Sequence, residues 1–97
     1  VQVSILPISD KFNEYAFEIK KVLEEKDIRV EVDTRAEKIG YKIREAQLNK
    51  VPYMLIVGEK EAENKTVSVR AREEGDIGAF EIEEFLNRIL DEIKNKK

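Results

Sequence analysis

The sequence contains no cysteine, no histidine and no tryptophan. Without cysteine and histidine, the chain has no disulfide, no thiolate nucleophile, no imidazole base and none of the usual zinc ligands. Its four glycines form neither the G-x-G-x-x-G turn nor the G-x-x-x-x-G-K-[ST] loop that cradle nucleotide phosphates. Most enzyme chemistries and nucleotide-binding loops are therefore not expected in this chain.

Long apolar runs are also missing. No stretch reaches the about 18–20 apolar residues of a membrane span, and the start VQVSILPISD lacks the basic residues and long apolar segment of a signal peptide. We therefore expect a cytoplasmic protein without a membrane partner. Because the chain begins with Val1 and its single methionine is Met54, we also expect it to be a piece of a longer polypeptide.

The composition fits one small domain with a strongly ionic surface. The chain has 97 residues, of which 41% are apolar and 40% are charged, and we expect a single domain over 1–97. Its net charge is −3, but residues 1–27 carry −2, residues 28–72 carry +3 and residues 73–97 carry −4. The negative total argues against a nucleic-acid partner, whereas the positive middle segment argues for one. Charge alone does not decide between them.

Apolar residues repeat with alternating periods along the chain. Spacing of i, i+3, i+4 and i+7 indicates amphipathic helices, whereas strict alternation or a short continuous apolar run indicates strands. The polar segment 59–65 is expected to be a loop, with Asn64 suited to a left-handed backbone. In the helix predicted over 35–49, the apolar residues face the core and Lys42 faces solvent. The predicted strands are 1–8, 28–33, 51–57, 66–70 and 77–80, and the predicted helices are 12–26, 35–49 and a final one that includes 82–93.

The order of these elements predicts the fold class. The chain opens with two βαβ units, which are right-handed and place helices on both faces of a parallel sheet. The strand over 66–70 returns from the central strand and is therefore antiparallel. We predict an α/β fold, a three-layer α/β/α domain with a mixed sheet of about five strands, one of them antiparallel. Ligands of such sheets bind at the carboxyl ends of the parallel strands, so the candidate site is the rim formed by segments 33–38 and 58–61.

The rim carries guanidinium, ammonium and carboxylate groups. These groups suit an unstacked RNA base, because guanine offers N–H donors to a carboxylate and acceptors to arginine. In an alternative interpretation they are exposed loop charges, with Arg35 paired to Asp33 or to a neighbouring carboxylate. Acidic pairs elsewhere lie on solvent faces of the predicted helices, without the burial that tunes a catalytic carboxylate. A phosphoacceptor receiver domain is disfavoured, because Ile8-Ser9 stands where it needs an acidic pair and Gly58-Glu59 stands where it needs an aspartate.

Three runs of sequence resemble the C-terminal anticodon-binding domain of threonyl-tRNA synthetase: VEVDTRAEKIGYKIREA over 30–46, VPYMLIVGEKE over 51–61 and TVSVR over 66–70. The prolyl, histidyl and glycyl enzymes carry related domains, but these runs are most similar to the threonyl version. The resemblance implies a mixed sheet with an antiparallel fourth strand and a domain that grips the tRNA anticodon, chiefly its second and third bases. In that family ATP and a zinc ion belong to the upstream catalytic domain, so no cofactor is expected in this chain.

The resemblance also implies which side chains contact the anticodon. They are Arg44, Glu61, Lys38, Arg70 and Arg35. Glu61 would accept from a guanine edge, Arg44 and Arg70 would donate to base acceptors, and Lys38 would serve a base or a phosphate. Ala36 stands where the family commonly has asparagine, and Arg70 would lie about 13 Å below the rim if its strand returns from there. The implied parent enzyme is a homodimeric threonine–tRNA ligase, and we expect the isolated domain to be monomeric and non-catalytic.

Two other functions stay open. A non-catalytic protein-interaction or dimerisation module of the same fold would suit the acidic total and the outward-facing Tyr41 and Leu48 of the second helix. A small-molecule domain would need a ligand-sized cavity at the edge of the sheet, for which the sequence contains no motif.

Overall fold

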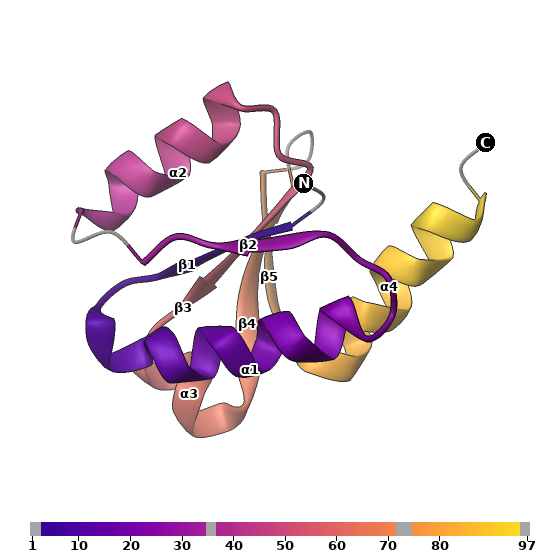
Figure 1. Cartoon of the computed structure of the whole chain (residues 1–97), viewed down its shortest axis with the longest axis horizontal. Coiled ribbons are helices and arrows are strands. Elements are labelled where there is room, and N and C mark those ends of the chain that lie inside the picture. The colour runs from indigo at the N-terminus through magenta and orange to yellow at the C-terminus, as the bar shows by residue number, and fades with distance from the viewer. Residues whose placement is uncertain (1–2, 35–36, 72–74, 96–97) are drawn as a thin grey trace.

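The computed structural model describes residues 3–34, 37–71 and 75–95. Strands and helices alternate along the first two thirds of the chain, and two adjacent strands precede the last helix (Figure 1). The elements are β1 (Val3–Pro7), a 3-10 turn η1 (Asp10–Phe12), α1 (Asn13–Glu24), β2 (Val30–Val32), α2 (Ile39–Leu48), β3 (Tyr53–Val57), α3 (Glu59–Asn64), β4 (Thr66–Ala71), β5 (Gly75–Glu81) and α4 (Ile82–Asn95).

The strands form one five-stranded sheet in the order β2-β1-β3-β4-β5. β1 pairs in parallel with β2 and with β3, whereas β4 is antiparallel to both β3 and β5. Within the described part of the chain, β4 is thus the one antiparallel strand, and the predicted fold class is confirmed. The continuous apolar run of β3 occupies the centre of the sheet, where both faces are covered, and the alternating β2 lies at an edge.

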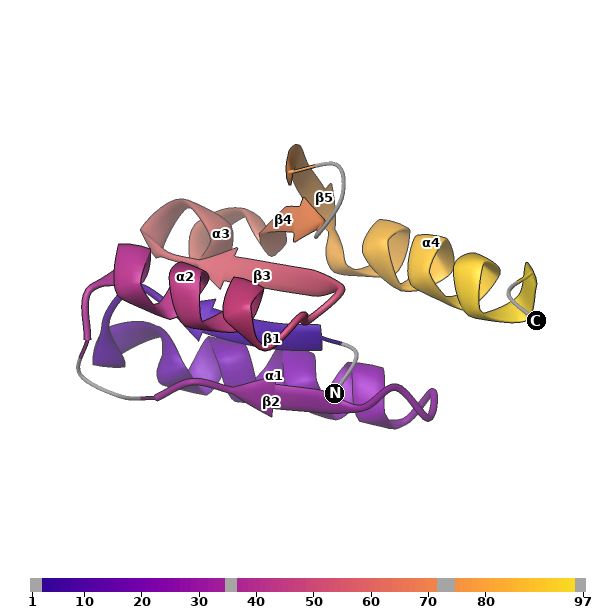
Figure 2. The ribbon, with the colours of Figure 1, turned by 90° about the horizontal axis from the view of Figure 1, so that it is seen from above.

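Helices cover the two faces of the sheet. α2 lies on one face and α1 on the other, with α4 following β5 and extending past the sheet (Figures 1 and 2). The larger apolar cluster joins α1 and α4 to one face, and it includes Ile19, Leu55 and Phe85. A smaller cluster joins Ala46 of α2 to Leu6 and Met54 on the opposite face. The predicted three layers are therefore present, but the α2 layer covers only part of its face.

The sequence pattern of α1 explains its position. Ser9 begins the preceding 3-10 turn, and its side chain accepts a hydrogen bond from the backbone N–H of Lys11 at 3.5 Å. Tyr15, Ala16, Ile19 and Leu23 of the helix are buried at helical spacing, as predicted. Val22, placed on the same stripe by sequence, is 36% exposed because it lies at the margin of the covered face.

The segment after β3 differs from its prediction as a loop. Residues Glu59–Asn64 form the short helix α3, which ends at Lys65 in the left-handed conformation, with a φ of 57°. The left-handed residue is thus Lys65 and not Asn64. The helix escaped prediction because none of its residues is fully buried and it therefore has no apolar stripe.

Candidate functional site

The structure places four of the five predicted anticodon-binding residues. Arg35 lies outside the described residues, as does Ala36. Lys38 is exposed and immediately precedes α2, at the carboxyl edge of the parallel strands. Arg44 lies on α2, Glu61 on α3 and Arg70 on β4.

Glu61 is held by two hydrogen bonds. Its Oε1 accepts from the backbone N–H of Gly58 at 2.7 Å, and its Oε2 accepts from the Oγ hydroxyl of Ser68 at 3.0 Å. The first bond satisfies a backbone donor at the start of α3, and the second ties α3 to β4. Ser68 was not predicted to belong to the site, because a lone serine in an alternating strand carries no sequence signal.

Gly58 lets the chain turn closely past the end of β1. A Cβ atom at this position would lie 2.7 Å from Cδ1 of Ile8 and 3.2 Å from Oε1 of Glu61. Ile8 is held next to Gly58 by a hydrogen bond, because its backbone N–H donates to the carbonyl of Val57 at 3.0 Å. The missing side chain of Gly58 therefore allows Glu61 to reach back to the backbone.

Arg70 lies on the same face of the sheet as α2. It pairs with Met54 of β3, and Met54 packs with Ala46 of α2 in the smaller apolar cluster. Ser68 pairs with Ile56 and shares this face, because side chains two residues apart on a strand point the same way. The half-buried side chains of Ser68 and Arg70 thus line the part of the face beyond α2.

Arg44 belongs to the flank of α2 that is turned away from β2. Lys42, Glu45 and Asn49 line a groove along β2, whereas Ile43 packs on the core. Helical periodicity then places Arg44 between the outer side of the helix and the flank that faces β4. Arg44 is exposed, and neither its side chain nor that of Arg70 has a hydrogen bond or an ion pair with another described residue.

Arg70 lies below the rim, as the length of its returning strand predicts. Glu61 lies in the first turn after β3, near the rim, but Arg70 lies opposite the second residue of β3. At about 3.3 Å per residue, three positions separate Arg70 from the end of β3 by roughly 10 Å. We therefore define the candidate surface as Ser68 and Arg70 on the sheet together with Arg44 of the adjacent α2 and Glu61 of α3, and call it the β4 face.

Lys42 is buried rather than solvent-facing, contrary to the prediction. Only 3% of it is exposed, and its Nζ donates to the backbone carbonyls of Pro7 at 3.0 Å and Asp33 at 3.1 Å. The carbonyl of Pro7 lies at the carboxyl end of β1, and that of Asp33 lies just after β2. Lys42 therefore fastens α2 to the ends of both strands.

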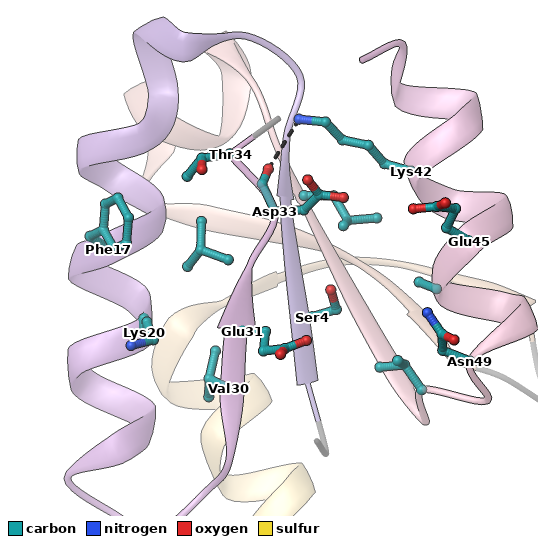
Figure 3. A pocket seen from close by; sticks show the side chains of 14 residues that line it. Ser4, Phe17, Lys20, Val30, Glu31, Asp33, Thr34, Lys42, Glu45 and Asn49 are labelled. Carbon is teal, nitrogen blue, oxygen red and sulfur yellow. Dashed lines mark hydrogen bonds between the residues drawn. The ribbon is translucent and has the colours of Figure 1, made fainter. Parts of the chain in front are cut away.

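A groove of about 800 Å³ lies on the other flank of α2, along the edge strand β2 (Figure 3). Its volume is that of a ligand pocket, which commonly measures about 300–1,000 Å³. Among the described residues, its ionisable lining consists of the carboxylates Glu31, Asp33 and Glu45 and the lysines Lys20 and Lys42. Since Lys42 already donates to two carbonyls, the described part of this lining does not favour a polyanion. The groove lies on the opposite flank of α2 from the β4 face.

Tyr15 of α1 contacts the chain where α3 ends and β4 begins. The hydroxyl of Tyr15 donates to the backbone carbonyl of Thr66 at 2.7 Å, and Nζ of Lys65 lies 5.6 Å from the centre of its ring. Burial, followed by the negative charges of Glu61 and Glu18, raises the pKa of Tyr15 to about 12. The phenol is therefore neutral at physiological pH and keeps donating to the start of β4.

The β4 face has the character of a binding surface of an α/β module. It offers a fixed carboxylate, a hydroxyl and guanidinium groups on an open sheet face. Among the described residues, no group of three or more acidic side chains is arranged to hold a metal ion. In the same part of the chain, no helix combines the length and apolar character that crossing a bilayer requires.

The profile of the family described as Anticodon binding domain matches residues 2–92, and the chain belongs to this family. Threonine–tRNA ligase of Acetivibrio thermocellus is 63% identical over 97 residues, which are 100% of this chain and 15% of that protein. The enzyme of the same name from Clostridioides difficile is 62% identical over 96 residues, again 15% of its length. The chain thus spans about 15% of the length of these curated relatives.

A solved structure agrees with these matches. The crystal structure of the RNA binding domain of threonyl-tRNA synthetase from Cryptosporidium parvum Iowa II has a TM-score of 0.88 and 33% identity, and covers 93% of this chain and 23% of that one. The resemblance to the anticodon-binding domain of threonyl-tRNA synthetase, inferred from sequence, is therefore confirmed.

Proposed function

We propose that this domain binds the anticodon arm of threonine tRNA and distinguishes its second and third bases, as part of a threonine–tRNA ligase. The observation that supports this most is the β4 face, where a fixed acceptor and two arginines lie on one side of a family-matched domain. The family match favours this function over the protein-interaction alternative. The 97 residues contribute recognition, and the ligase chemistry with its ATP and zinc belongs to the remainder of the parent protein.

The chemical roles follow from donor and acceptor capacity. Ionised Glu61 only accepts hydrogen bonds, so it suits the N–H groups of a guanine edge. Arg44 and Arg70 only donate, so they suit base acceptors or phosphate oxygens. In this proposal Lys38, at the start of α2, contacts a base or a phosphate. The proposal includes a homodimeric parent enzyme, a monomeric isolated domain and a cytoplasmic location.

Titration with fluorescent anticodon stem-loops tests the proposal. The threonine loop is compared with a loop of equal length and charge whose second and third bases are changed. We expect the threonine loop to bind more tightly, because changes at a base read by hydrogen bonds cost about 1–3 kcal/mol each. Equal affinity of the two loops, measured at one fixed salt concentration, would refute base recognition by this domain.

The variant Arg44→Ala tests the surface itself. If Arg44 contacts a base edge, its loss should weaken the threonine loop by about 1–3 kcal/mol and reduce discrimination between the two loops. Lys21→Ala is the matched control, because Lys21 is an exposed cation on α1, on the opposite face of the sheet. Equal effects of the two substitutions would mean that only overall charge matters.

A further inference from the structure

Ser68 lies on β4 within the β4 face, and it is hydrogen-bonded to Glu61, the acceptor of this surface. Its Oγ donates to Oε2 of Glu61 at 3.0 Å, while the backbone N–H of Gly58 donates to Oε1 at 2.7 Å. The two donors come from different elements, one from β4 and one from the start of α3. The carboxylate of Glu61 is therefore anchored at both oxygens.

Double anchoring fixes the plane of the carboxylate. The terminal torsion of a glutamate joins an sp³ to an sp² carbon and has a broad energy profile, so one hydrogen bond leaves it free to turn. A second bond to the other oxygen removes that freedom before any ligand arrives. Because a carboxylate has about four acceptor sites, about two remain for a ligand after Gly58 and Ser68 are served.

We propose that Ser68 is a positioning residue that aims the unused acceptor sites of Glu61 at an RNA base with N–H donors on its Watson–Crick edge. This inference rests on the proposed function and adds to it the group that sets the orientation of the acceptor. Ser68 and Arg70 point to the same side of β4, and two residues separate them by about 7 Å along the strand. The acceptor Glu61 on α3, held from β4 by Ser68, and the donor Arg70 on β4 thus belong to the same side of the sheet.

A purely structural role for Ser68 has a different signature. If the hydroxyl only fastened α3 to β4, its loss would weaken every RNA loop alike and would act whether or not residue 61 is a carboxylate. If it positions the carboxylate, its loss matters only for the base that Glu61 contacts and only while Glu61 is present. A double-mutant cycle separates these cases.

The experiment measures stem-loop affinity for the wild type, Ser68→Ala, Glu61→Gln and the double variant. Ser68→Ala should weaken the threonine loop by about three- to tenfold, the value of one hydrogen bond to a charged group after partial compensation by water. The same substitution should change the affinity for the loop with changed second and third bases by less than about twofold. In the Glu61→Gln background, adding Ser68→Ala should also change the affinity for the threonine loop by less than about twofold.

Two further variants complete the test. Ser68→Thr keeps the hydroxyl and suits a strand, so it should bind within about twofold of the wild type. Thr66→Ala removes a hydroxyl two residues earlier on the same face of β4 and should not reproduce the effect of Ser68→Ala. The inference would be overturned if the effects of Ser68→Ala and Glu61→Gln were independent and additive, or if Ser68→Thr lost affinity. Either result would leave the proposed function intact as long as the wild type distinguishes the two loops. A wild type that does not discriminate would instead refute the proposed function, and this inference with it.

Discussion

The buried lysine of α2 leads to a prediction about stability. Lys42→Met should lower the free energy of unfolding, because it removes the donor shared by the carbonyls of Pro7 and Asp33. Methionine keeps most of the volume of the lysine stem, so the substitution tests the ammonium group with little loss of packing.

The magnitude follows from opposing terms. Each hydrogen bond from a charged donor contributes about 1.5–3 kcal/mol, so two bonds contribute roughly 3–6 kcal/mol. Lys42 is only 3% exposed, and the burial of its ammonium group offsets part of this value. That desolvation cost is removed when methionine replaces lysine. We expect a net loss of about 2–3 kcal/mol, which corresponds to a decrease of roughly 10–20 °C in Tm for a domain of this size.

Urea unfolding followed by far-ultraviolet circular dichroism measures the change. Lys38→Met is the matched control, since Lys38 is an exposed lysine next to the same helix and its loss should change stability by less than about 0.5 kcal/mol. If Lys42→Met were as stable as the wild type or more so, the desolvation of the ammonium would equal or exceed the value of its two bonds. The assigned role of Lys42 in fastening α2 to the sheet would then be wrong.

Two further predictions concern the surroundings of Glu61. Gly58→Ala should lower the unfolding free energy by about 1 kcal/mol, because the new Cβ would lie 2.7 Å from Cδ1 of Ile8. Urea unfolding measures this loss. If Gly58→Ala caused the same loss in an Ile8→Ala background, the steric cause would be refuted. The pKa of Tyr15 is raised from 10.0 to about 12 in the folded chain, so the unfolded state loses its proton first and stability should fall as pH rises from 10.0 to about 12. Tyr15→Phe should remove this part of the alkaline decrease, and an unchanged pH dependence in that variant would contradict the assignment.

Periodicity was sufficient to predict most of the fold. The apolar run of β3 indicated a strand covered on both faces, and β3 is the centre of the sheet. The stripe of α1 indicated a helix packed on the core, and four of its residues are buried. These patterns can be read from sequence because burial of a whole face repeats with the period of the element.

The location of the β4 face was less predictable. The resemblance supplied Arg44, Glu61 and Arg70, but the rim expected from parallel strands does not contain Arg70, since an antiparallel strand carries it away from that edge. The exposure of Lys42 was predicted wrongly, because a long side chain at the margin of a helical stripe can turn inward when acceptors are available. Those acceptors are the backbone carbonyls of Pro7, which ends β1 35 positions away, and of Asp33, which follows β2.

Sequence by itself determined the order of the elements, the faces they bury and the family to which the chain belongs, because these depend on local periodicity and on runs of residue types. Tertiary structure alone decided which polar groups are already bonded to the protein. Lys42 meets Pro7 across 35 positions, and Ser68 meets Glu61 across the turn between α3 and β4. Such pairings depend on strand register and helix placement, and no local pattern of residues encodes them.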